Sequence, residues 1–331
     1  MQNIGIDLAD FEYIRKNNLI YVDKTEFLYK IVSENKYYFL SRPRRFGKTL
    51  FVDTLEKFYQ GKKDLFEGLY ISNQDLDWEK HPVIRLDFNE IISQTTEQLK
   101  IVLTEKLIDY ANQYNLELTS TYVPTKFNEL IKKISKKTKH GVVLLVDEYD
   151  KPILSHFGVI EGSINKIRTA RANQNFLKLV YDNLKPLEPY LEKVFITGVT
   201  KFSKLSIFST LNNLIELDQN EEFAEIMGYT EKELDEYFSP YFSKLAEKNN
   251  LTISECRNKF KQMYNGFRFT EKDSRVYNPF SVGNALKNAD FDNYWFESGT
   301  PTFLVELIKN KNFDLSNLEN IEVGKNEIKA Y

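Results

Sequence analysis

The chain of 331 residues has one cysteine, Cys256, and three histidines. A single cysteine excludes a disulfide framework within the chain, and this usage is typical of a reducing, cytosolic setting. The histidines are far apart and show no metal-ligand spacing, so the sequence does not indicate a histidine-based metal site. No histidine near Cys256 suggests a base, and we therefore expect a buried thiol rather than a nucleophile.

Long apolar runs and a net basic charge are also missing. The first fifteen residues include acidic side chains and predict neither a signal peptide nor a membrane span, so we expect a cytoplasmic protein. The formal net charge is −3, and a contact with nucleic acid would need a local basic patch. The strongest basic run, at 132–140, lies at the end of an expected helix without interleaved aromatics, which favours a solvated helix face.

What the sequence does contain is an alternation of apolar strands and amphipathic helices. The run at 142–146 is apolar at every position, which is typical of a strand buried on both faces of a parallel sheet. Alternation over the first ~220 residues predicts a doubly wound α/β domain. The expected strands are at 36–41, 82–88, 142–146, 193–203 and 212–218, and the expected helices are at 49–59, 96–114, 127–138 and 166–185.

The segment FLSRPRRFGKTLF, at 39–51, has the features of a phosphate-binding loop. The full pattern is G-x-x-x-x-G-K-[ST], and Gly47, Lys48 and Thr49 fill its last three positions. Arg42 stands where the first glycine is expected. Gly-Lys-Thr can occur by chance at a helix start, but the strand before it and the amphipathic helix after it favour a phosphate loop.

Each part of this loop has an expected role toward a magnesium nucleotide. The backbone N–H groups of 46–49 lie at a helix N-terminus, where the helix dipole favours a phosphate. Lys48 is expected to reach the β- and γ-phosphates, and the Thr49 hydroxyl to ligate Mg²⁺. The predicted nucleotide-binding residues are Arg44, Arg45, Phe46, Gly47, Lys48, Thr49 and Leu50.

A second acidic segment supports this interpretation. The strand at 142–146 ends in Asp147 and Glu148, the arrangement in which an aspartate holds Mg²⁺ through water and a glutamate acts as general base. A polar turn after a core strand would look similar. The two segments nevertheless occur in the right order, about 100 residues apart, and together they indicate a magnesium-nucleotide site.

The strand after the acidic pair ends near Thr197, which we expect to contact the γ-phosphate or the attacking water. Thr200 and Lys201 are further candidates, and a simple turn through Gly198 is the alternative. We expect this strand to lie between the strand of the phosphate loop and the strand of the acids. Glu148, Lys48 and Thr197 form the predicted catalytic set.

Several arginines are open to two interpretations. Arg44 and Arg45 flank the nucleotide and could supply a charge that stabilises the transition state. Alternatively, they could pair with acids such as Asp147 or Asp150, or be exposed to solvent. Arg168 and Arg171 could act on a neighbouring subunit's nucleotide or lie on a solvated helix face. Arg268 could reach the phosphates, or it could be structural beside aromatic residues.

Taken together, the motifs resemble the bacterial AAA-ATPase-like family, whose members are often fused to a C-terminal PD-(D/E)XK nuclease-like domain. The resemblance extends from about residue 3 to 310 and implies that Arg42 is the family's own variant. It also implies that Lys48 and Thr49 bind ATP and Mg²⁺, and that Asp147 and Glu148 are the Walker B acids. It rests on the segments VDKTEFLYKI, FLSRPRRFGKTL, VVLLVDEYDKPI, ITGVTKFSKLSIFSTLNNL, MGYTEKEL, MYNGFRF, VYNPFSV and YWFESGTPTFL.

The resemblance implies a P-loop AAA-ATPase-like domain at 1–228 and a smaller, mainly helical, lid-type domain at 229–331, with a winged-helix-like form as an alternative. Thr230 and Glu233 form a capping box that predicts a helix start. We expect the helical domain to be truncated and the nuclease part to be absent. The two E-x-K tripeptides, at 34–36 and 327–329, do not indicate a nuclease.

The implied function is magnesium-dependent ATP hydrolysis coupled to a conformational change that acts on an unknown, nucleic-acid-related target. One alternative is a nucleotide-gated binding module with little turnover, and another is a structural remnant that no longer binds nucleotide. The preference for adenine comes from the resemblance. Nucleic acid, a nuclease-like partner domain and oligomer formation are further expectations for partners, and membrane contact is not expected.

Overall fold

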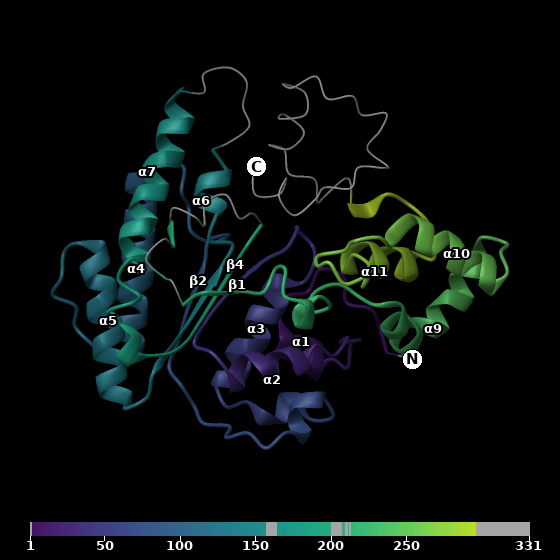
Figure 1. Cartoon of the computed structure of the whole chain (residues 1–331), viewed down its shortest axis with the longest axis horizontal. Coiled ribbons are helices and arrows are strands. Elements are labelled where there is room, and N and C mark those ends of the chain that lie inside the picture. Colours follow the sequence, from purple (N-terminus) through teal and green to yellow (C-terminus); the bar gives the residue numbers. More distant parts are fainter. Residues whose placement is uncertain (1, 157–163, 200–206, 209–210, 212, 296–331) are drawn as a thin grey trace.

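The computed structural model describes residues 2–156, 164–199, 207–208, 211 and 213–295. A parallel five-stranded sheet forms the centre of this part of the chain (Figure 1). Its order is β2-β3-β4-β1-β5, so β4 lies between β1 and β3 as expected from the sequence. The carboxyl ends of the strands therefore meet at one edge. The strands are β1 (Tyr37–Ser41), β2 (Val83–Asp87), β3 (Val142–Asp147), β4 (Leu191–Gly198) and β5 (Ile215–Glu216).

Helices cover both faces of the sheet, which confirms the doubly wound α/β prediction (Figure 1). Strand side chains alternate between the faces, so Tyr37 and Phe39 of β1 pack into one core while Tyr38 and Leu40 pack into the other. The first face carries α4 (Thr96–Gln113), α5 (Val123–Thr138) and α7 (Ile164–Tyr181), and the second carries α1 (Phe11–Lys16), α2 (Thr25–Ser33) and α3 (Lys48–Tyr59).

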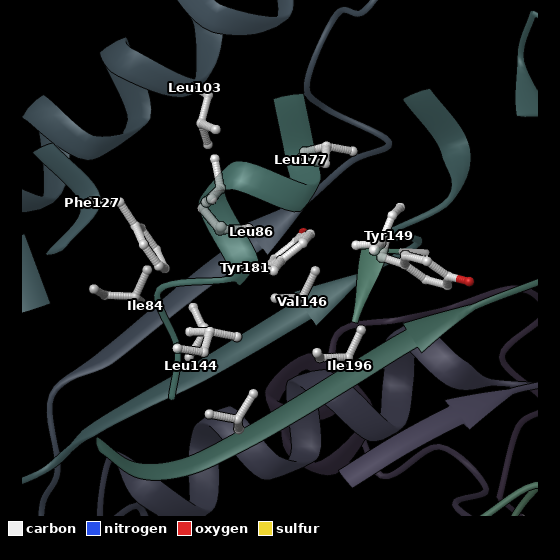
Figure 2. Close-up of a cluster of buried hydrophobic side chains, with 14 of the residues drawn as sticks. Ile84, Leu86, Leu103, Phe127, Leu144, Val146, Tyr149, Leu177, Tyr181 and Ile196 are labelled. Carbon is white, nitrogen blue, oxygen red and sulfur yellow. The ribbon is translucent and has the colours of Figure 1, made fainter. Parts of the chain in front are cut away.

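Figure 2 shows the core on the first face, where Leu144 and Val146 of β3 lie among side chains of neighbouring strands and helices. All six residues of β3 are buried, and the apolar run at 142–146 predicts this for the first five. Burying one such side chain contributes about 1.5–3 kcal/mol, so β3 has a firmly held position. The acidic residues at the end of β3 are therefore held in a defined place as well.

Local signals explain where several helices begin. The capping box of Thr230 and Glu233 precedes α9 as predicted, and Thr95 starts α4 in the same way. Helix α5 begins four residues earlier than the expected 127 because Pro124 suits a first helical turn. The short elements are α6 (Lys151–Leu154) and the 3₁₀ segments Lys63–Phe66, Tyr70–Asn73, Glu188–Tyr190 and Glu221–Phe223.

The described residues after 229 are mainly helical. They hold α9 (Glu231–Lys248), α10 (Ile253–Tyr264) and α11 (Pro279–Asn288), which share a third core. Cys256 is fully buried there, as expected. Ile4 and Val22 join the same core, so the N-terminal segment packs against the helical part. In the described residues, no helix combines the length and the apolar character needed to cross a membrane.

Candidate nucleotide site

The phosphate loop leaves β1 at Ser41 and enters α3 at Lys48. Gly47 has φ 93°, in the left-handed region, yet a Cβ added to it would meet nothing within 4 Å. Glycine is therefore required for its conformation and not for space. Gly47 is also the N-cap of α3, and the N–H groups of the first helical turn have no acceptor within the helix. Such N–H groups favour an anion.

Lys48 connects this loop to the end of β3. Its side chain is 3% exposed, and its Nζ donates to the carbonyl oxygens of Arg42 at 2.9 Å and Pro43 at 3.2 Å. The same Nζ lies 3.1 Å from Oε1 of Glu148, one hundred positions further along the chain. A buried ammonium needs such partners, because burial of an unpaired charge is costly. The two segments that the sequence analysis connected thus meet in the fold.

Thr197 holds both acids at the end of β3. Its Oγ1 donates to Oδ1 of Asp147 and accepts a hydrogen bond from the Glu148 backbone N–H at 3.3 Å. The side chain is fully buried and does not line the cavity described below. Its contacts therefore orient the two acids, whereas the sequence led us to expect a direct contact with phosphate or water. Asp147 is also fully buried, and its Oδ2 has no hydrogen-bond partner in the described part of the chain.

Glu148 adopts a strained backbone conformation. Its φ is 54°, and a residue with a side chain in this region costs on the order of 1–3 kcal/mol. The hydrogen bond from its N–H to Thr197 and the ion pair with Lys48 hold it there. In this conformation the carboxylate of Glu148 contacts Lys48 of the phosphate loop.

A cavity of about 490 Å³ is lined by these segments, and its volume is typical of small-molecule sites. All seven predicted nucleotide-binding residues lie on its wall, together with Glu148. Apolar side chains such as Ile20, Val22 and Met227 form another part of the lining. The wall comes from the phosphate loop, the N-terminal segment, the ends of β2, β3 and β4 and the C-terminal part, namely from residues 44–51, from 5–24, from Asn89, from 148–155, from Val199, from 226–229 and from Pro279 and Phe280.

Asp150 ties the end of β3 to the end of β4. It is fully buried, and its two carboxylate oxygens accept from the Val199 N–H at 3.1 and 3.2 Å. A Cβ on Gly198 would lie 2.4 Å from the ring of Tyr149, so glycine permits this close approach of the two strand ends. The sequence alone left the role of Asp150 unassigned.

Sequence reasoning missed two polar residues at the end of β2. Asn89 lines the cavity and accepts from Lys151 Nζ at 2.8 Å. Asp87 is paired in register with Asp147, and burial, together with the negative charge of Asp147, raises the pKa of Asp87. The sequence could have indicated both residues. Asp87 lies near the end of the strand expected at 82–88 and Asn89 directly follows it, and the carboxyl ends of parallel strands meet at the same edge of a sheet.

Arg42 points into the protein and not toward the cavity. It is 2% exposed, and its NH1 lies 3.4 Å from Oδ1 of Asp218 and donates to the Ser41 carbonyl at 2.9 Å. Its guanidinium carbon lies 4.2 Å from the ring centroid of Phe269. Burial lowers the pKa of Arg42 to about 10, and the charge of Asp218 opposes this shift.

The other two arginines of the loop differ from each other. Arg45 pairs with Asp7, not with the acids proposed from the sequence, and it stacks at 4.8 Å over Phe280. Arg44 is exposed, and its carbonyl oxygen accepts from Trp295 Nε1 at 3.0 Å. Both arginines lie on the cavity wall.

The remaining candidate residues lie apart from the cavity or are not described. Arg168 and Arg171 are exposed on α7, and Arg268 is exposed beside the aromatic residues that surround it in sequence. None of the three is among the residues that line the cavity. Thr200 and Lys201 lie outside the described residues.

Residues 3–208 match the model of the AAA-ATPase-like family, described as predicted AAA-ATPase. The chain belongs to the AAA-ATPase-like family. The matched region contains the phosphate loop, the acids after β3 and the end of β4, so the family assignment covers this side of the cavity. This AAA-ATPase-like chain is also 35% identical over 309 residues to an uncharacterized protein in the vnfD 5′ region of Azotobacter chroococcum mcd 1. The alignment covers 93% of this chain and 56% of that relative.

Proposed function

We propose that this chain is a magnesium-dependent ATPase that binds ATP in the cavity at the phosphate loop and hydrolyses the bond to the γ-phosphate. The observation that carries the proposal is the 3.1 Å contact between Lys48 and Glu148 on the cavity wall. A cation that can bind phosphate and a carboxylate that can accept a proton from water are adjacent there. Membership of the AAA-ATPase-like family supports the same activity.

In this proposal the phosphate chain of ATP lies against the start of α3. The N–H groups of the first helical turn donate to the β-phosphate, and Lys48 exchanges its carbonyl partners for β- and γ-phosphate oxygens. Of the two arginines on the wall, Arg44 is better placed to reach the γ-phosphate, because Arg45 is paired with Asp7 and stacked on Phe280.

The residues present fit a magnesium ion. Mg²⁺ in P-loop enzymes takes a hydroxyl, water, phosphate oxygens and a carboxylate, and does not require a cage of protein ligands. Accordingly, the described residues contain no group of three or more His, Cys, Asp or Glu that could hold a metal alone. Thr49 supplies the hydroxyl, and Asp147 has a buried oxygen without a partner. When bound, Mg²⁺ would neutralise phosphate charge.

Glu148 is the proposed general base. It must leave Lys48 before it can orient water, and phosphate oxygens provide Lys48 with replacement partners. Thr197 acts as a positioning residue, because its hydroxyl fixes both the Asp147 carboxylate and the Glu148 backbone. Substrate binding thus prepares the base by removing its ion-pair partner.

Phosphate release and binding of a fluorescent ATP analogue test the proposal with wild type, Lys48→Ala and Glu148→Gln. We expect Lys48→Ala to weaken binding at least ~10-fold, since a hydrogen bond to a charged group contributes about 1.5–3 kcal/mol. Glu148→Gln should bind normally and turn over about 10²–10⁴-fold more slowly. Lys57→Ala, which lies on α3 but does not line the cavity, is the matched control. Unchanged binding by Lys48→Ala would refute the site.

The same assay distinguishes the nucleotide-gated module from the enzyme. Wild-type protein that binds the analogue without releasing phosphate would support the gated module. We propose that turnover moves the helical part and acts on a partner, and a DNA or RNA titration of the ATPase rate tests a nucleic-acid target. The chain spans just over half of the relative it matches, so the partner of the whole protein is part of this proposal.

A further inference from the structure

Two side chains from the C-terminal helical part hold the backbone of the phosphate loop. Asn278 Nδ2 donates to the carbonyl oxygen of Arg45 at 3.3 Å, and Trp295 Nε1 donates to that of Arg44 at 3.0 Å. The donors lie more than 230 positions further along the chain. Asn278 is 1% exposed, so its amide points into the protein and not toward solvent.

The backbone to which these side chains donate hydrogen bonds is strained. Arg45 has φ 69°, which a residue with a side chain adopts only at a cost of about 1–3 kcal/mol. Such conformations persist where the surroundings determine them from several sides. Here the Arg45 side chain is held by Asp7 and Phe280, and its carbonyl by Asn278. The next residue, Phe46, is buried against Phe267 and Phe269.

A planar trans peptide points its C=O and its N–H in opposite directions. Holding the carbonyls of Arg44 and Arg45 therefore also orients the N–H groups of Arg45 and Phe46, which follow in the same peptide units. Residues 44–49 line the cavity, and backbone N–H groups are what a phosphate loop offers to its ligand. The orientation of part of this loop is thus determined from outside the family-matched region.

We propose that Asn278 and Trp295 are positioning residues for nucleotide binding, which hold the phosphate loop in the conformation that accepts a polyphosphate. The proposal deepens the proposed function and rests on it for the identity of the ligand. Neither residue lines the cavity. Both therefore act through the loop and not on the nucleotide itself.

Two isosteric or conservative variants isolate these hydrogen bonds. Asn278 also caps α11 by accepting from the Ser281 N–H at 2.9 Å, and Asn278→Asp keeps that cap while removing the donor to Arg45. Trp295→Phe keeps an aromatic ring beside Phe267, whose centroid lies 5.5 Å from that of Trp295, and loses the Nε1–H together with one ring of the indole.

Matched controls exist for both variants. Asn284→Asp removes a side-chain amide that donates to the Phe280 carbonyl within α11, and Trp78→Phe changes the tryptophan that packs on Phe58 and Phe66. Thermal unfolding checks that all four variants fold. Trp78→Phe also leaves Trp295 as the sole tryptophan, so its fluorescence reports directly on the loop when ATP is added.

Two readouts are measured, namely backbone amide hydrogen exchange of residues 44–49 without nucleotide and the Kd for Mg-ATP. We expect Asn278→Asp and Trp295→Phe each to speed exchange at residues 45 and 46 and to raise Kd by about two- to tenfold, the range for one hydrogen bond. The unfolding midpoint of Trp295→Phe should match that of Trp78→Phe. Asn278→Asp buries a carboxylate and should unfold at a lower temperature than Asn284→Asp, so exchange is compared under conditions where all four variants are folded. Exchange and affinity equal to the controls would overturn the proposal, as would an equal loss in Asn284→Asp. If the two variants exchange faster but the wild type does not bind ATP, the ATPase function is refuted, while the role of Asn278 and Trp295 in holding the loop conformation is retained.

Discussion

Replacing Arg42 by glycine restores the general phosphate-loop pattern, and we expect it to destabilise the protein. Arg42 fills a buried space between the strand ends and the helical part. Its guanidinium faces Asp218 at 3.4 Å on one side and the Phe269 ring at 4.2 Å on the other. Glycine would remove all of these contacts and take the Arg42 guanidinium away from the buried Asp218 carboxylate.

The expected magnitude follows from the burial of the pair. Arg42 and Asp218 have side chains that are 1% and 4% exposed. Removing one partner of a buried ion pair costs about 3–5 kcal/mol, because the other charge stays buried. Domains are stable by about 5–15 kcal/mol, so this loss is a large share of the total. Arg42 is therefore not a degenerate glycine but a structural part of this loop.

Equilibrium unfolding in urea measures this loss, with Arg275→Gly as the control. Arg275 is 60% exposed and, among the described residues, forms an ion pair with the exposed Asp273, so its replacement should change stability by less than about 1 kcal/mol. Asp218→Asn should cost less in the Arg42→Gly background than in wild type, since the attraction between Arg42 and Asp218 is then already lost. A loss below about 1 kcal/mol for Arg42→Gly would refute the reasoning.

Two further predictions concern Thr197 and Lys193. Thr197→Val removes the hydroxyl that orients both acids. In steady-state kinetics it should lower kcat by roughly 10–100-fold with a smaller change in KM. An effect on KM alone would contradict this prediction. Lys193 caps α2 by donating to the Ile31 carbonyl at 2.6 Å, and burial lowers the pKa of Lys193 from 10.5 to about 8. Between these two pKa values the unfolded chain binds more protons than the folded chain, so the free energy of unfolding rises with pH. In wild type, Lys193 should contribute roughly 2–3 kcal/mol to this rise between about pH 7 and 10. Urea unfolding of Lys193→Met should show the rise reduced by that amount. If the free energy of unfolding rises with pH to the same extent in Lys193→Met, the rise comes from other titratable groups.

The sequence was sufficient to predict the fold and the site wherever a local pattern determines the structure. The apolar run before Asp147 predicts a buried strand, and in a parallel sheet its end must lie at the same edge as the end of the strand before the phosphate loop. The capping box at Thr230 is likewise local. The contacts of Arg42 and Arg45 could not be predicted in this way. Their partners, such as Asp218 at 176 positions and Asn278 at 233 positions, share no periodicity or motif with them.

Three residues of this loop contact the C-terminal part, and one of them is Arg42, which stands at the position of the first glycine of the general pattern. Arg42 contacts Phe269, Arg45 contacts Phe280, and Phe46 packs against the ring of Phe267. Under the proposed function, nucleotide and helical part therefore bind to the same few peptide units. Thermodynamic linkage is reciprocal, so contacts that help the loop to accept ATP must be strengthened by ATP to the same extent. The arginines that make the loop look unlike a nucleotide site then couple nucleotide binding in the loop to the position of α11.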